Sequence, residues 1–233
     1  MKITNYCVRK VRRSIKLVLK KIGQLGIVWP FVMFYTRIIE VVRPFNGDVQ
    51  SDMPTILAIN PDRFFGDLTV LSNSKCFRVL KLPFKWQVKL LDIFWPSNIS
   101  ELTRFANFYN PGDNKHLIEV QVQLRTFLRK FLVSLYSRLK VDCVIGSAVH
   151  NRQDFDWGLV SDEIGVPYIV LHKENIYMPG AYELLYEKYK KMGKFRGSQI
   201  VVHNDMMKDF FIKSGFCNSD NISALGCLRM DEF

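Results

Sequence analysis

The sequence predicts an α/β fold, a Rossmann-like doubly wound parallel sheet, preceded by a basic amphipathic helix. Short apolar runs rich in β-branched residues alternate with helical patterns, the order typical of a parallel sheet with crossover helices. The runs are apolar throughout, as in strands that are buried on both faces. Nine of the 33 Lys and Arg residues precede Glu40, and no acid does. We therefore separate a basic leader, residues 1–43, from a body, residues 53–226.

The leader has the pattern of a helix that lies on a membrane surface. Residues 22–36 carry no charge, but Pro30 interrupts them, and they fall short of the roughly 20 apolar residues that span a bilayer. We expect a helix on the anionic cytoplasmic leaflet, with the protein cytoplasmic and peripheral to the inner membrane. A helix packed on its own domain, or a signal or true anchor, are the alternatives. Before this run, apolar side chains recur at steps of three and four with cations between them: Val8, Val11, Ile15, Leu19 and Ile22.

The body contains six apolar runs that we predict to be strands of one parallel sheet. Four helices are expected around them, at 115–139, from near Asp156, at 181–192 and at 205–214. This alternation predicts helices on both faces of the sheet. The predicted strands are Thr55–Asn60, Phe77–Leu82, Val141–Ser147, Tyr168–His172, Gln199–His203 and Ile222–Leu225.

Composition and missing motifs exclude several classes of function. Because nine of the eleven net charges lie in the leader, the body is nearly neutral, and no nucleic-acid partner is expected. Five scattered cysteines without CxxC spacing indicate neither a zinc site nor a disulfide framework, and a reducing compartment fits. There is no GxGxxG, GxxxxGK[ST], GxSxG or HExxH sequence. We therefore expect no dinucleotide cofactor and no metal.

Polar residues follow the predicted strands, at the sheet edge where ligands bind in this architecture. Asn, Asp and His in these places also cap the helices that follow strands, and Asn204 or Asp205 is most simply such a cap. Candidate substrate-binding residues are Arg63, Asp67, His150, Lys173, Asn175 and Asn204.

His172 and Glu174 form the sharpest candidate pair, since an imidazole and a carboxylate two residues apart beyond a buried strand can act as an acid/base site. We assign Glu174 as the acid or base and His172 as its orienting partner; a loop hydrogen bond is the ordinary alternative. Asp62 is a third catalytic candidate. It flanks, with Asp67, the sequence Phe-Phe-Gly at 64–66, which we expect to be a turn that admits substrate.

Four stretches carry a resemblance to a known family: VDCVIGSA, VPYIVLHKEN, QIVVHNDMMKDFFIKSGF and ISALGCLRMDEF. Residues 141–231, which contain them, resemble the later half of the N-terminal domain of GT-B glycosyltransferases that build bacterial surface polysaccharides. These relatives include the capsule-polysaccharide and glycerophosphotransferase groups and the UDP-N-acetylglucosamine 2-epimerases that share the fold. In the last stretch Gly226, Arg229 and Asp231 occupy the positions of a Gly-x-x-Arg-x-Asp passage, which makes Arg229 a further binding candidate.

The resemblance implies that residues 53–226 are an acceptor-side domain and that 227–233 begin a linker to an absent second domain. That domain would bind the nucleotide-sugar donor, so this chain alone is expected to transfer no sugar. The acceptor would be a glycan or lipid-linked molecule at the inner membrane face. Glu174 falls where epimerase-like relatives place a functional acid, but their Glu-Ala-Gly is missing here. A non-catalytic membrane-associated binding module and an epimerase-like enzyme are the alternatives.

Overall fold

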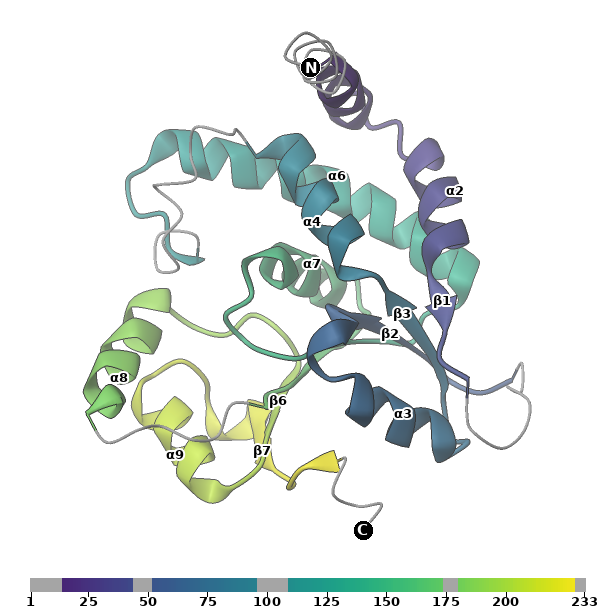
Figure 1. Ribbon diagram of the computed structural model, residues 1–233. Helices are drawn as coiled ribbons and strands as arrows, with labels where there is room; N and C mark the ends of the chain where they lie inside the picture. The colour runs from purple at the N-terminus through teal and green to yellow at the C-terminus, as the bar shows by residue number, and fades with distance from the viewer. Residues whose placement is uncertain (1–13, 44–51, 96–108, 174–179, 229–233) are drawn as a thin grey trace, which may run out of the picture.

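The computed structural model describes residues 14–43, 52–95, 109–173 and 180–228, and in them the chain forms an α/β fold around one seven-stranded, mostly parallel sheet (Figure 1). The six predicted strands are confirmed, each to within two residues. The two-residue strand β1 was not predicted, because so short a run has no recognisable pattern. The strands are β1 (Glu40–Val41), β2 (Thr55–Ile59), β3 (Arg78–Leu82), β4 (Cys143–Gly146), β5 (Tyr168–Leu171), β6 (Gln199–Val202) and β7 (Ile222–Ala224).

The order of the strands places a switch point between β2 and β4. Across the described sheet the order is β1-β3-β2-β4-β5-β6-β7, and only β1 runs antiparallel. The chain first moves from β2 outward to β3, then returns past β2 and continues from β4 in the opposite direction. In open α/β sheets a ligand crevice forms where the winding reverses, outside the carboxyl ends of the strands.

The helices agree only in part with the sequence expectations. Two predicted helices match their observed bounds, and Pro30 does not interrupt a helix but lies in the first turn of one, where its missing N–H costs nothing. The helix expected from near Asp156 begins four residues earlier, at Arg152. The helices are α2 (Trp29–Ile38), α3 (Phe65–Asn73), α4 (Phe84–Phe94), α6 (Lys115–Leu139), α7 (Arg152–Glu163), α8 (Ala181–Met192) and α9 (Asp205–Lys213), with short 3-10 turns at Pro61–Arg63 and Ser219–Asn221.

The two faces of the sheet are covered unequally. The main core lies on one face, where α2, α4, α6, α7, α8 and α9 contribute buried apolar side chains, whereas α3 packs on the other face over a smaller cluster (Figure 1). All of β2 is buried, but in β5 Val170 is fully buried while Ile169 and Leu171 are half-buried. The expectation that every strand is buried on both faces is therefore wrong for β5, because no described helix covers its second face as α3 covers that of β2.

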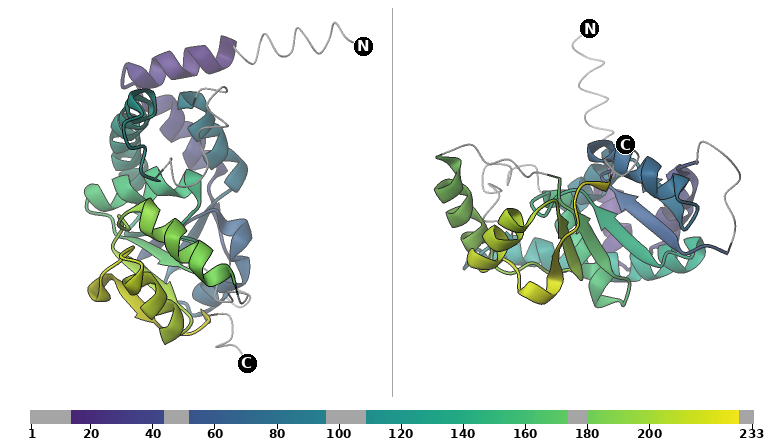
Figure 2. Two further views of the ribbon diagram at one scale, coloured as in Figure 1. Left: turned by 90° about the vertical axis from the view of Figure 1, so that its left-hand side faces the viewer. Right: turned by 90° about the horizontal axis from the view of Figure 1, so that it is seen from below.

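A further helix, Ser14–Gln24, lies beyond the helical layer, on the side away from the sheet (Figure 2). Leu19 and Ile22, two members of the expected apolar stripe, pack against the main core of the domain. Leu17 and Val18 are 61% and 56% exposed. Within the described residues no single helix is long and apolar enough to cross a membrane; this helix and α2, bent by 114°, pass such a test only together.

Candidate functional site

The loops at the switch point converge on one buried carboxylate, that of Asp154 in the first turn of α7. Asp154 is 1% exposed. Its Oδ1 accepts a hydrogen bond from Gln87 Nε2 at 2.8 Å, and its Oδ2 accepts from Asn151 Nδ2 at 2.9 Å and Asn60 Nδ2 at 3.5 Å. The end of β2, helix α4 and the start of α7 are thereby joined through a single side chain.

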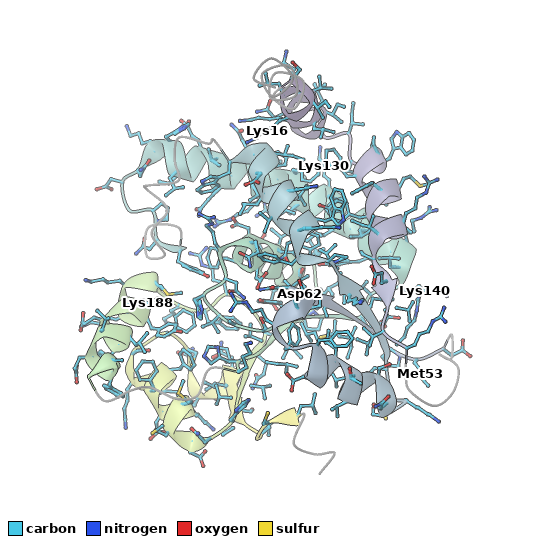
Figure 3. The ribbon with its side chains drawn as sticks, in the orientation of Figure 1. Lys16, Met53, Asp62, Lys130, Lys140 and Lys188 are labelled. Carbon is cyan, nitrogen blue, oxygen red and sulfur yellow. The ribbon has the colours of Figure 1, made fainter. Side chains whose placement is uncertain are left out.

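The polar side chains that follow β2 differ in burial. Asn60 has a left-handed conformation (φ 55°, ψ 49°), which asparagine tolerates better than most residues, and its buried side chain reaches Asp154. Asp62 and Arg63 follow on the surface of the turn, and Figure 3 shows Asp62 in the central part of the molecule. The turn expected over 64–66 is wrong: α3 already begins at Phe65, and Asp67 is 6% exposed in its first turn.

Burial raises the pKa of Asp154 to about 7, although the three amides and the nearby charge of Arg63 act in the opposite direction. A carboxyl group with such a pKa exchanges its proton near neutral pH, which is typical of functional sites but also of structural networks. Because Asp154 lies beneath the surface, we interpret it as a positioning residue. It holds the loops that follow β2 and β4 in one arrangement.

The two histidines of the site occupy different depths. His172 is fully buried; its backbone N–H donates to the carbonyl oxygen of Val201 at 2.8 Å, and its ring packs edge-on against Phe211 with centroids 5.2 Å apart. His150 is half-buried, with Nδ1 3.4 Å from the Tyr189 hydroxyl and its ring centroid 6.3 Å from that of His172. His150 therefore lies nearer to solvent, and the ring of His172 packs beneath it in the interior.

Lys173 and Asn204 make hydrogen bonds in the loops that follow β5 and β6. Lys173 Nζ donates to the Arg63 carbonyl oxygen at 2.6 Å, so the segment after β5 reaches the turn after β2. The Asn204 side chain accepts the Met207 N–H at 3.0 Å as the cap of α9, which is the ordinary role expected for such a residue. Glu174, Asn175 and Arg229 lie outside the described residues.

Sequence reasoning missed Asp154 and Gln87. One signal was present: Asp154 is spaced three residues from Trp157 and seven from Ser161, so an acid occupies the buried face of α7. Gln87 gives no such signal, because only the folded chain brings α4 beside α7. No group of three or more His, Cys, Asp or Glu residues suited to a metal ion occurs in the part of the chain that the structure describes.

No protein-family model matches this chain, and neither a characterised protein nor a solved structure matches it. The geometry of the switch point and the chemistry of the side chains around it are therefore the basis for inferring a function.

Proposed function

We propose that the chain is the acceptor-binding domain of a group-transfer enzyme of the GT-B glycosyltransferase type. The observation that carries the proposal is the convergence of the loops after β2, β4 and β5 at the switch point, through the Asp154 hydrogen bonds and the contact from Lys173 to Arg63. Open α/β sheets bind their ligands at this place. Donor binding belongs to a second domain, which would supply the nucleotide-linked sugar.

The chemistry of the edge favours an acceptor that carries hydroxyl and phosphate groups. Exposed Asp62 and half-buried His150 can accept protons or hydrogen bonds from hydroxyls, while Arg63, Arg152 and Lys173 carry positive charge to the same edge. The N-termini of α7 and α9 also point their partial positive charge to the carboxyl side of the sheet. A sugar phosphate or a lipid-linked sugar phosphate combines the groups that such an edge recognises.

In this proposal Glu174 is the general base that takes the proton of the attacking hydroxyl, and His172 positions the loop that carries it. A base of this kind accelerates transfer because the hydroxyl becomes nucleophilic as its proton leaves. The full burial of His172 supports a positioning role rather than contact with substrate. Epimerase chemistry is not part of the proposal, because nothing at the described edge favours it over transfer.

Membrane attachment at the cytoplasmic face is the second part of the proposal. Lys16, Lys20 and Lys21 precede a bend at which Leu25 and Trp29 are 74% and 66% exposed. Cations beside exposed apolar side chains are typical of segments that lie at an anionic lipid surface. A lipid-linked acceptor would be reached from that surface.

Backbone amide NMR of the intact chain tests the binding role. Titration with hexose 1-phosphates should shift amide resonances of residues 60–63 and 147–152, whereas a nucleoside diphosphate alone should shift few of them. Arg63→Ala should weaken the sugar-phosphate shifts, and the matched control Arg138→Ala, in the exposed last turn of α6 that leads into β4 at the opposite edge, should not. Absence of shifts at both segments at millimolar ligand, or equal loss in the control, would refute a sugar-phosphate site at this edge.

A further inference from the structure

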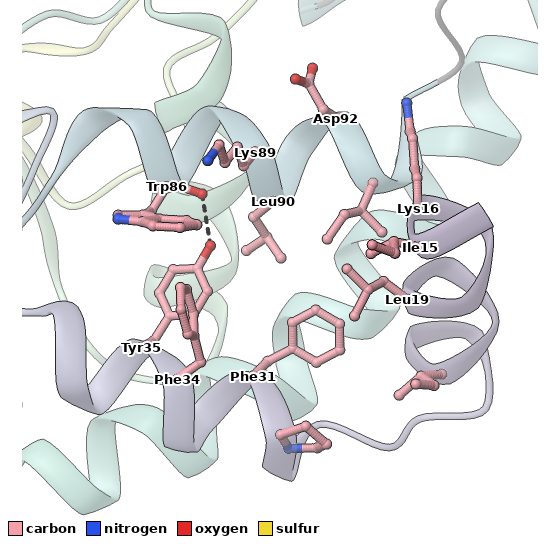
Figure 4. A pocket seen from close by; sticks show the side chains of 13 residues that line it. Ile15, Lys16, Leu19, Phe31, Phe34, Tyr35, Trp86, Lys89, Leu90 and Asp92 are labelled. Atoms are coloured by element: carbon pink, nitrogen blue, oxygen red, sulfur yellow. Dashed lines mark hydrogen bonds between the residues drawn. The ribbon is translucent and has the colours of Figure 1, made fainter. Parts of the chain in front are cut away.

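Three helices enclose an apolar groove at the end of the molecule that carries Ser14–Gln24. The groove lies between this helix, α2 and α4 and has a volume of about 780 Å³ (Figure 4). Apolar side chains from all three helices line it, among them Leu19, Phe31, Phe34, Trp86 and Leu90. Cavities that hold small molecules typically measure roughly 300–1,000 Å³, so the groove has the size of a ligand site.

Polar groups in the groove are confined to its rim or already engaged. The Tyr35 hydroxyl donates to the Trp86 carbonyl oxygen at 2.7 Å, and Lys16 Nζ donates to the Trp95 carbonyl oxygen at 3.1 Å. Lys89 Nζ lies 4.1 Å from the centroid of the Trp86 ring, over its face. The interior therefore offers apolar contact, and the opening beside Trp86 offers a cation.

The groove is continuous with the exposed apolar surface around the bend. Ile15 and Phe34 line it and are nevertheless 53% and 38% exposed, and Ile27 and Trp29 continue the exposed surface between the two helices. Exposed apolar surface of this kind marks a site of association. The groove lining carries Lys16 and Lys89 against one acid, Asp92, and Lys20, Lys21 and Arg37 add positive charge to the same two N-terminal helices, so charge complementarity favours an anionic amphiphile over a neutral apolar partner.

We propose that this groove binds the hydrocarbon tail of an anionic membrane lipid, with the lipid headgroup beside Lys89. This goes beyond the proposed function, because lipid capture requires no transfer reaction. It also places the lipid beside the candidate site: Trp86 lines the groove, while its neighbour Gln87 donates to Asp154 from the same helix. Helix α4 is thus the shared wall of the two regions.

Tryptophan fluorescence with brominated lipids tests the proposal. In a Trp29→Phe background of the full chain, Trp86 reports the groove, because Trp95 and Trp157 are 7% and 2% exposed. Monomeric lysophosphatidylglycerol with a brominated acyl chain should quench Trp86 with one-to-one saturation, and the lysophosphatidylcholine analogue should bind more weakly.

Two variants with matched controls assign the effect to the groove. Lys89→Glu should weaken binding roughly 30-fold, since each cation near an anionic headgroup contributes about 1 kcal/mol and charge reversal doubles the loss. Lys190→Glu makes the same charge change on α8 and should leave binding unchanged. Phe34→Asp should abolish quenching, whereas Ile118→Asp, at an equally exposed apolar position of α6, should not.

Three outcomes would overturn the proposal. The first is absence of Trp86 quenching by the brominated lysophosphatidylglycerol, which would mean that no acyl chain enters the groove. The second is quenching that both lysolipids cause equally and that Phe34→Asp leaves intact. The third is absence of quenching together with a doubled mass in light scattering that Phe34→Asp abolishes, which would assign the groove to a second copy of the chain.

Discussion

The groove and the switch-point edge are built from opposite kinds of side chain, although one helix borders both. The groove has aromatic and aliphatic walls with a lysine at its rim, whereas the edge has amides, carboxylates and imidazoles around a buried acid. Apolar walls accept any chain of suitable length, while a buried polar network fixes particular loop positions. Helix α4 therefore separates a region suited to a lipid tail from a region suited to a polar head.

The largest effect is expected for Glu174, in the two-domain enzyme that we propose. Glu174→Gln keeps the shape of the side chain and removes its charge, and it should lower turnover by about 100-fold, the usual scale for a general acid or base. Turnover is measured with radiolabelled donor, and circular dichroism checks that the fold is intact. Glu187→Gln on the exposed face of α8 serves as the control. Near-normal turnover in Glu174→Gln would leave it as a loop carboxylate with a capping role.

Asp154→Ala tests whether the edge depends on its polar network. Removing the carboxylate leaves Gln87, Asn151 and Asn60 without the acceptor that they share, and the unfolding free energy should fall by about 3 kcal/mol. Urea denaturation measures it. Glu187→Ala should change the free energy by less than about 0.5 kcal/mol, as at most surface positions. An equally small effect of Asp154→Ala would mean that the loops hold their places by packing alone.

The same network predicts a pH dependence that the groove does not share. The Asp154 pKa is raised from 3.8 to about 7 in the folded chain, so the folded state holds this proton more tightly than the unfolded state. Its contribution to stability is fully present below about pH 4 and is lost as pH rises through about 7. Between pH 5.5 and 8.5 the loss should be roughly 2 kcal/mol.

Urea denaturation at these two pH values compares the wild type with Asp154→Asn, which cannot ionise. The variant should lose less stability across the interval, and Asp156, whose pKa is also raised by burial, is unchanged in both proteins. Identical pH profiles would show that Asp154 is already ionised, or already protonated, throughout this range.

The sequence predicted the sheet well because its signal is local. An apolar run such as TILAI is enough by itself to predict a buried strand. The 25 residues of α6 carry enough helical periodicity to predict both ends of that helix. Helices α2 and α4 were harder to predict: α2 is uncharged apart from Arg37 in its last turn, and α4 mixes cations and aromatics in one short segment.

For the candidate site, the sequence predicted only that its residues follow the ends of parallel strands. That Lys173 and Arg63 meet follows from parallel strands ending at one edge, although they are 110 residues apart. The depth of each side chain does not follow: His172 is buried beneath the edge, and Asn204 serves as a cap. The Asp154 network forms only when the end of β2, helix α4 and the start of α7 are brought together by the fold. No local sequence pattern encodes that arrangement.

Hydrogen exchange of the intact chain on anionic vesicles tests the division between the two regions most directly. Vesicles alone should protect amides of residues 14–38 and 84–94, and residues 60–63 and 147–152 should exchange as in solution until a hexose 1-phosphate is added. Neutral vesicles should protect neither region. Unchanged exchange at 14–38 on anionic vesicles, or protection of 60–63 and 147–152 by vesicles alone, would contradict the separation of a lipid-facing groove from a polar acceptor site.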